Sequence, residues 1–196
     1  SVLKYSMINY LKDIPKKEEI KLYIECRKIL TVPIIGFIAE YGEMRLKELT
    51  ASERIRIKNE KNSYGIGKTH IQIAAAKYLL KLGYRVFIIN DITYMQDLMM
   101  ARQMGDHEQV NNLIGLATHY ADIVVWDELG RSRYSEAKED MYFQILNELY
   151  KQKKRVLFSS NEDRETIEFK IGMAAYSRLR GMTNGHILEL SGPDMR

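Results

Sequence analysis

A glycine-rich stretch that ends in a lysine and a threonine carries the clearest chemistry in this sequence. "NSYGIGKTH", residues 62–70, ends as the phosphate-binding pattern G-x-x-x-x-G-K-[ST] does. In such a loop, backbone N–H groups point at a phosphate and the following helix presents its positive N-terminus to the same anion. We expect Gly65 and Gly67 to let the backbone curl around ATP, Lys68 to reach its β- and γ-phosphates, and Thr69 to hold Mg²⁺. The candidate nucleotide-binding residues are Asn62, Ser63, Tyr64, Gly65, Ile66, Gly67, Lys68, Thr69 and His70.

The first position of this loop departs from the pattern, because Asn62 stands where the pattern has glycine. That position often needs a left-handed backbone, which asparagine tolerates better than most residues with a Cβ. Asn62 therefore weakens the match without refuting it. Taken alone, the stretch also fits a surface turn that precedes a lysine.

Two carboxylates follow a buried strand about sixty residues further on. In "ADIVVWDELG" the apolar run Ile123 to Trp126 leads directly into Asp127 and Glu128. Ligands of parallel α/β sheets bind at the carboxyl ends of the strands, so we expect Asp127 to coordinate Mg²⁺ and Glu128 to polarise the attacking water. The alternative is a strand end whose acidic residues cap the next turn, with Trp126 as a core residue.

A third polar strand end occurs in "RVLFSSNED", where an apolar run ends in Ser159, Ser160 and Asn161. An amide at Asn161 would lie between the two phosphate-site elements, where it could position the attacking water and sense the γ-phosphate. Asparagine is otherwise a common turn or helix-cap residue, and only its context favours the sensor role.

The elements that must position these residues alternate between helix and strand from about residue 62 onward. Such alternation predicts an α/β fold, with a parallel sheet flanked by helices. We expect helices at 69–83, at 92–105 with Asp91 as cap, at 110–120, at 135–152 and in pieces across 163–180. We expect strands at 84–90, 122–126, 155–160 and 186–190.

Residues 1–60 have a different texture, and we expect them to form a small, mainly helical segment that binds a partner or acts as a linker. An amphipathic helix is predicted after Pro15, and Pro33 breaks it. The ATPase domain is predicted to span residues 61–196.

Composition sets limits on the class of protein. The chain has 196 residues, of which 45% are hydrophobic and 29% charged, as in a soluble globular domain. Its one cysteine, Cys26, excludes an internal disulfide framework or a cysteine-rich zinc cluster and favours the reducing cytoplasm. No apolar run is long enough to span a bilayer. The net charge of +4 suits a polyanionic partner without proving one.

The loop, "VVWDELG", "LFSSN" and above all "AAYSRLRGMTNGHILELSGPDMR" resemble the AAA+ ATPases of the DnaC/DnaI helicase-loader type and their IstB relatives, over residues 62–196. The resemblance implies that Arg178 of the "SRL" segment is an arginine finger, which reaches the ATP site of a neighbouring subunit; Arg180 is the rival. Two features depart from the family. Ala174 stands where many relatives have a second arginine. The polar stretch "RIRIKNEK" stands where relatives have an apolar strand before the loop; either Ile55 and Ile57 form a short substitute for that strand, or residues are absent.

The resemblance further implies a cytoplasmic loader of a DnaB-type replicative helicase, which self-associates through its ATP sites and engages single-stranded DNA, with no role at a membrane. The segment 92–120 corresponds to the family's DNA-contacting insertion, and its candidate DNA-binding residues are Arg102, Gln103, His107, Asn111 and Asn112. Three alternatives remain: an IstB-like transposition ATPase, a nucleotide-gated DNA-binding adaptor with little hydrolysis, and a small-molecule kinase, for which the sequence offers no convincing phosphate-clamping arginines.

Overall fold

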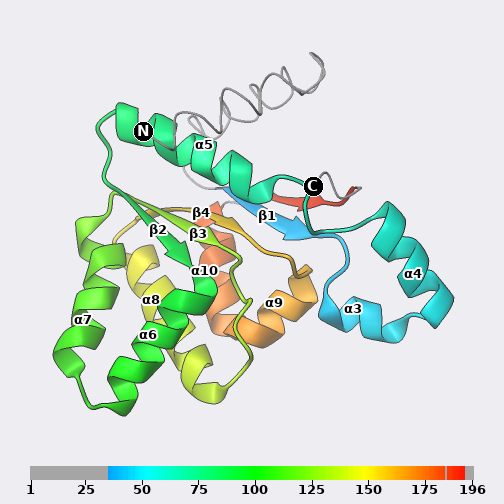
Figure 1. Ribbon diagram of the computed structural model, residues 1–196. Coiled ribbons are helices and arrows are strands. Elements are labelled where there is room, and N and C mark those ends of the chain that lie inside the picture. Colours follow the sequence, from blue (N-terminus) through cyan, green and yellow to red (C-terminus); the bar gives the residue numbers. More distant parts are fainter. Residues whose placement is uncertain (1–34, 184, 193–196) are drawn as a thin grey trace.

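The computed structural model describes residues 35–183 and 185–192. Within them, five strands form one sheet in the order β2-β3-β4-β1-β5, and every pairing between neighbouring strands is parallel (Figure 1). The predicted α/β fold with a parallel sheet is therefore confirmed. The strands are β1 (Ile35–Ala39), β2 (Val86–Asn90), β3 (Ile123–Asp127), β4 (Arg155–Ser159) and β5 (Ile187–Leu190).

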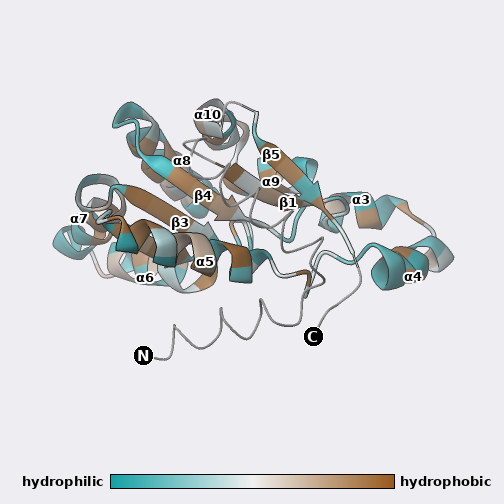
Figure 2. Cartoon of the chain, turned by 90° about the horizontal axis from the view of Figure 1, so that it is seen from above, coloured by the Kyte–Doolittle hydropathy of each residue, from teal (hydrophilic) through white to brown (hydrophobic). Residues whose placement is uncertain are grey.

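Helices cover both faces of the sheet. The helix α5 lies across one face, and α6 to α10 cover the other, while α3 and α4 extend beyond the sheet (Figure 1). Brown, apolar colouring in Figure 2 concentrates on the strands between these layers. The helical elements are α3 (Glu43–Glu48), α4 (Ala51–Glu60), α5 (Lys68–Lys81), α6 (Asp91–Gln103), α7 (His107–Gly115), the π-helix η1 (Leu116–Tyr120), α8 (Glu136–Lys151), α9 (Arg164–Ile171) and α10 (Met173–Thr183).

Side chains alternate across the strands, so each strand supplies both layers of the core. On the α5 face a small cluster forms from Ile35, Phe37, Ala75, Ala76, Val125 and Leu157. On the opposite face, neighbours in the same strands join a larger cluster with α6 to α10; it includes Ile38, Val124, Trp126, Val156 and Phe158. This two-sided burial is what a central parallel sheet requires.

Glycine is required at position 36 by the packing of β1 against β4. A Cβ built on Gly36 would lie 2.2 Å from the Phe158 ring, inside van der Waals contact. Gly36 and Phe158 are partners in the β1–β4 register, so the ring occupies the space over the glycine. The glycine in "IGFIA" thus allows β1 to pack next to β4.

The position of β1 corrects the boundary that the sequence suggested at residue 61. Ile35–Ala39 lies between β4 and β5 and is buried along its whole length, so the sheet includes residues from the segment before the boundary. The idea that Ile55 and Ile57 substitute for the missing strand is wrong, because both lie in α4 and Ile55 is 63% exposed. The chain instead passes through α3 and α4 between β1 and the glycine-rich loop (Figure 1).

The predicted helix after Pro15 and the position of Cys26 lie outside the described residues. In the part of the chain that the structure describes, no helix combines the length and apolar character needed to cross a membrane.

Asp91 has a different place from the one predicted. Asn90 caps α6, its side chain accepting a bond from the Thr93 N–H at 3.3 Å. Asp91 turns into the core, where its carboxylate accepts bonds from Trp126 Nε1 (3.0 Å), the Tyr142 hydroxyl (2.8 Å) and the Ser132 N–H (2.9 Å). Burial raises the pKa of Asp91, and these donors oppose that rise. The carboxylate thereby ties the loop after β3 to α6 and α8.

Replacing Asp91 with alanine is expected to lower the free energy of unfolding by roughly 3 kcal/mol, because several buried donors lose their acceptor at once. Urea unfolding followed by circular dichroism measures the change. Asp97→Ala, an exposed position on the same helix, is the matched control and should change stability by less than about 0.5 kcal/mol. Equal effects of the two substitutions would refute the role assigned to Asp91.

Candidate nucleotide-binding site

The glycine-rich loop connects α4 to α5 and is anchored at its start by non-covalent contacts. The backbone carbonyl of Asn62 accepts a bond from the Gly192 N–H at 3.0 Å, just after β5. Lys61 pairs with Glu40, the residue after β1, at 2.5 Å. These contacts place the loop at the carboxyl end of β1 although α3 and α4 intervene in the sequence.

Asn62 fits the first position of the loop by a different means from the one expected. Among the described non-glycine residues only Glu128 and Lys153 have a positive φ, so Asn62 is not left-handed. Its side-chain oxygen instead accepts a bond from the Tyr64 N–H at 3.0 Å. Asparagine commonly bonds the backbone two residues on in this way, and the bond starts the turn.

The end of the loop has the backbone geometry of an anion-binding nest. Gly65 and Gly67 have φ values of 70° and 87°, and Gly67 is the N-cap of α5. No side chain caps this helix, so its first N–H groups have no side-chain partner there. Left-handed glycines ahead of an uncapped helix N-terminus form a concave site for a phosphate.

Lys68 points into this nest. Its side chain is buried, with a relative exposure of 6%, and Nζ donates to the backbone carbonyl of Ser63. Burial lowers the pKa of Lys68 to about 8, although the charges of Asp127 and Glu128 oppose the fall. A lysine held this way gains stabilisation when an anion enters, because the desolvated ammonium then acquires a partner.

The two strand ends named in the sequence meet the loop at one edge of the sheet. The Thr69 hydroxyl donates to Asp127 Oδ1 at 3.1 Å, and the Ser159 hydroxyl donates to the same oxygen at 2.7 Å. Asn161 Nδ2 donates to Glu128 Oε1 at 3.0 Å. The parallel register explains this convergence: Trp126 and Phe158 are partners, so the residues that follow them emerge side by side.

Glu128 is held with a φ of 56°, a strained conformation for a non-glycine residue. Its backbone N–H donates to the Ser159 hydroxyl at 3.3 Å. Together with the bond from Asn161, this contact fixes where the carboxylate of Glu128 points. Strain of this kind is typical of residues aimed at a ligand.

The donor set fits a magnesium triphosphate. Mg²⁺ binds hydroxyl and carboxylate oxygens and retains several waters, which matches the neighbouring Thr69 and Asp127. The buried cation of Lys68 and the glycine nest suit the phosphates. Outside this pair, no cluster of three or more His, Cys, Asp or Glu side chains in residues 35–183 and 185–192 could hold a metal.

Other predicted residues lie apart from this edge. Arg178 is on α10, where Nε donates to Asn147 of α8 at 3.1 Å and the guanidinium lies 5.3 Å from the Tyr150 ring centre. Arg180 and Ala174 are exposed on the same helix, and His70 is exposed on α5. These contacts of Arg178 are with α8 and not with Asp127 or Glu128.

The candidate DNA-binding residues are all exposed, at the end of α6 and along α7. Arg102 is the one residue of that set with a permanent charge, and Asp106 and Glu108 follow closely in the chain. This surface therefore carries little positive charge to attract a polyanion.

Two contributors to the site were missed by the sequence reasoning. Ser159 bonds both members of the acidic pair, and a serine that ends the strand beside them was a readable signal for it. Arg131 reaches back to the loop, where Nη1 donates to the Tyr64 hydroxyl at 3.2 Å and the guanidinium lies 5.7 Å from the ring centre. Nothing in the sequence around Arg131, three residues after Glu128, indicated that its side chain would contact the loop.

In a comparison with known protein families, residues 52–174 match the family described as IstB-like ATP binding protein. Among curated relatives, the chain is 29% identical over 124 residues to the chromosomal replication initiator DnaA of Microcystis aeruginosa, covering 57% of this chain and 27% of that protein. It is 28% identical over 98 residues to the putative ATP-binding protein of insertion sequence IS21 from Pseudomonas aeruginosa, covering 50% and 35%. The chain thus spans about a third or less of the curated relatives it matches.

Solved structures share the fold. AMPPCP-bound DnaA from Aquifex aeolicus has a TM-score of 0.65 at 20% identity, over 95% of this chain and 50% of that chain. The DnaC helicase loader has a TM-score of 0.61 at 16% identity, over 88% and 89%, and DnaI has the same score and identity over 95% and 89%.

Proposed function

The chain belongs to the family of IstB-like ATP-binding proteins and has the AAA+ P-loop ATPase fold, and we propose that it loads a DnaB-type replicative helicase onto single-stranded DNA. ATP binding and hydrolysis act as the assembly switch. The observation that carries the proposal is the meeting of Lys68, Thr69, Asp127, Glu128 and Asn161 at one edge of the sheet.

Each of these side chains has a separate task in the proposed chemistry. Lys68 and the loop bind the phosphates, and Thr69 and Asp127 would hold Mg²⁺, which would supply positive charge to the phosphate oxygens. Glu128 accepts the proton of the attacking water, and the amide of Asn161 orients both the water and Glu128. Ser159 keeps Asp127 and the backbone of Glu128 in place.

The share of each relative that this chain covers favours the loader function over other AAA+ functions. The likeness to DnaC extends over 88% of this chain and 89% of the loader, whereas the likeness to DnaA takes in about half of that protein. The segment "AAYSRLRGMTNGHILEL", which carries the resemblance to loaders, forms α10 and β5 in the described structure.

A second candidate function is that of an ATPase serving a transposase. It is favoured by the match to the IstB-like family over residues 52–174 and by the likeness to the IS21 protein. The two functions share the ATP site and differ in the protein that is bound.

Affinity capture from host lysate separates the two, with ATP or ADP present and with Lys68→Ala as the control bait. A hexameric helicase recovered by the wild-type bait with one nucleotide, and not by Lys68→Ala, is the expected result. Recovery of a transposase in its place would support the second function.

Arg178 is proposed to act as a finger in a neighbouring subunit. Its Nε donates to Asn147 and its guanidinium lies over the Tyr150 ring, so the proposed role requires these contacts to be exchanged for the γ-phosphate when a neighbouring subunit docks. Arg178→Ala is expected to bind ATP normally and to lower hydrolysis by the assembly at least about tenfold. Arg180→Ala, at the exposed position two residues on, is the control and should retain full turnover.

A mixing experiment tests whether Arg178 acts between subunits. Arg178→Ala keeps its own catalytic glutamate and Glu128→Gln keeps its finger, so mixed assemblies should regain part of the activity that each variant lacks. Mixtures no more active than the separate variants would refute action in a neighbour.

A further inference from the structure

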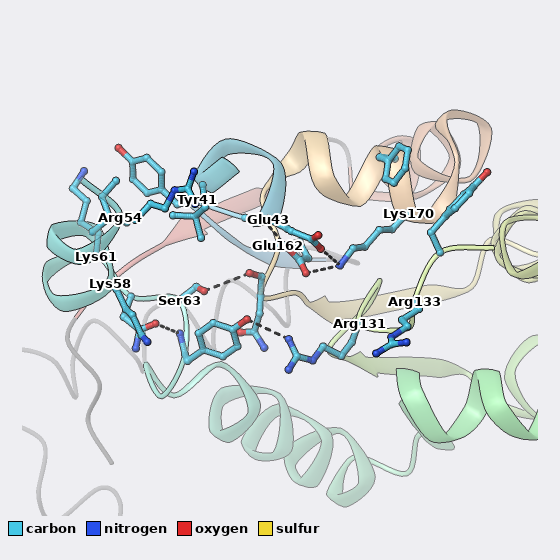
Figure 3. Close-up of a pocket in the computed structure, with 18 residues that line it drawn as sticks. Tyr41, Glu43, Arg54, Lys58, Lys61, Ser63, Arg131, Arg133, Glu162 and Lys170 are labelled. Carbon is cyan, nitrogen blue, oxygen red and sulfur yellow. Dashed lines mark hydrogen bonds and ion pairs between the residues drawn. The ribbon is translucent and has the colours of Figure 1, made fainter. Parts of the chain in front are cut away.

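A pocket beside the ATP site has the composition of a site for single-stranded nucleic acid. Its volume is about 960 Å³, and it opens between α3 and α4 on one side and the loop after β3 with α9 on the other (Figure 3). Asn62, Ser63 and Tyr64 of the glycine-rich loop line it, whereas Gly65 to Thr69 do not. Asn161, which bonds Glu128, also lines the pocket, so the pocket adjoins the nucleotide site and extends away from it toward α3, α4 and α9.

Six cations line this pocket, from both of its sides. Figure 3 shows Arg54, Lys58 and Lys61 on one side and Arg131 and Arg133 on the other. Lys170 is the sixth, and it is neutralised by Glu162 at 2.7 Å and Glu43 at 3.2 Å. These two are the acidic residues that line the pocket, and both are occupied by Lys170.

Four of the cations are not paired with a carboxylate of the described residues. Arg54 donates to the backbone carbonyls of Leu49 and Lys47, each at 2.9 Å, which holds its guanidinium without cancelling it. Arg131 is held by the Tyr64 hydroxyl. In the described part of the chain, no carboxylate lies within ion-pair distance of Arg54, Lys58, Arg131 or Arg133. The open pocket is thus strongly positive.

Aromatic rings are exposed between these charges. Tyr64 and Tyr134 are 41% and 42% exposed, and Phe169 is 55% exposed. The rings of Tyr134 and Phe169 are in contact, with their centres 5.0 Å apart and their planes tilted by 30°. Single-stranded nucleic acids bind to surfaces on which exposed rings lie among cations, because the bases stack on the rings and the phosphates pair with the cations.

We propose that this pocket binds single-stranded nucleic acid, with Arg54, Lys58, Arg131 and Arg133 on the phosphates and Tyr64, Tyr134 and Phe169 against the bases. The proposal rests on the proposed function, to which it gives a binding surface. It places the strand between α3–α4 and the opposite wall of the loop after β3 and α9, and not on the weakly charged α6–α7 surface. Alternation of cations and rings favours a nucleic acid strand over an acidic protein segment, which needs no stacking partners.

The test removes two charges that hold nothing else in place. Lys58→Ala/Arg133→Ala changes exposed side chains from opposite walls, and the control Lys81→Ala/Lys151→Ala removes two exposed charges elsewhere. Fluorescence anisotropy with a labelled oligothymidylate of about 15 nucleotides measures affinity over a salt series. An oligouridylate and a duplex of the same length are the other probes.

Each neutralised phosphate of a single strand contributes about 0.7 to the slope of log affinity against log salt. The pocket variant is therefore expected to bind the oligothymidylate roughly 20-fold more weakly near 0.1 M salt, with a slope shallower by about 1.4, while the control variant matches wild type. Oligouridylate should respond in parallel, because phosphates and stacking are shared by DNA and RNA.

Three outcomes would overturn the assignment: equal losses in pocket and control variants, a loss seen only with Arg102→Ala, or duplex bound as tightly as the single strand. Binding of a fluorescent ATP analogue is measured in parallel. Normal ATP binding with no effect of the pocket variant removes this site and leaves the ATPase standing. If the wild-type protein does not bind the ATP analogue but shows the expected salt effect, the nucleotide site is refuted and the nucleic acid site is supported.

Discussion

Replacing Lys68 with alanine is expected to weaken ATP binding at least about a hundredfold, to the point of abolishing it in practice. The ammonium lies buried against the carbonyl of Ser63, and it is the cation at the centre of the glycine nest. Charge-assisted bonds to phosphate in a desolvated site are among the strongest that a side chain makes. Without the cation, the nest presents N–H groups alone.

Isothermal titration calorimetry at pH 7 checks this result, since the pH is below the Lys68 pKa of about 8 and the free site is charged. Lys68→Met, which keeps the apolar stem, separates loss of charge from loss of packing. Lys81→Ala, an exposed lysine at the far end of α5, is the matched control. ATP binding by Lys68→Ala with wild-type affinity would show that the nest is not the nucleotide site.

The substitution Glu128→Gln is expected to lower hydrolysis by on the order of 10²–10⁴-fold while ATP remains bound. The amide oxygen of the introduced side chain can still accept the bond from Asn161, which measures 3.0 Å in the parent protein, so the side chain keeps its place. An amide cannot take a proton from water. The variant should therefore hold ATP and prolong the assembly on DNA.

Phosphate release measures the turnover of this variant, and the lifetime of the assembly on labelled single-stranded DNA measures the trapping. Glu136→Gln, the same chemical change at an exposed position in the first turn of α8, is the control. An adaptor that binds ATP only to order its surface predicts that Glu128→Gln retains all function. Unchanged turnover in the assembled state would remove Glu128 as the base.

The part of the fold that follows the glycine-rich loop could be predicted because its signals are local. Apolar runs such as Ile123–Trp126 are buried strands, and polar residues at their ends meet at one edge in any parallel sheet. Asp127, Glu128 and Asn161 could therefore be named without knowing the order of the strands.

The position of β1 could not be predicted, because neighbours in a sheet are not marked in the sequence. "IGFIA" reads as an apolar segment, yet its place between β4 and β5 depends on contacts such as Gly36 with Phe158. Because a strand was expected directly before the loop, Ile55 and Ile57 were candidates for it, but both lie in α4. Asp91 was misassigned for a related reason: an acidic residue at a helix start is usually a cap, and only tertiary donors make it a core residue.

The detour through α3 and α4 also changes what determines order in the glycine-rich loop. With no strand leading straight into it, the loop owes its register to the Asn62–Gly192 bridge and the Lys61–Glu40 pair. Thermodynamic linkage then couples the loop to Gly192: a nucleotide that favours the ordered loop also favours the Asn62–Gly192 bridge, and loss of that bridge lowers nucleotide affinity by the same factor. Protection of the Gly192 amide against hydrogen exchange should therefore increase when ATP binds.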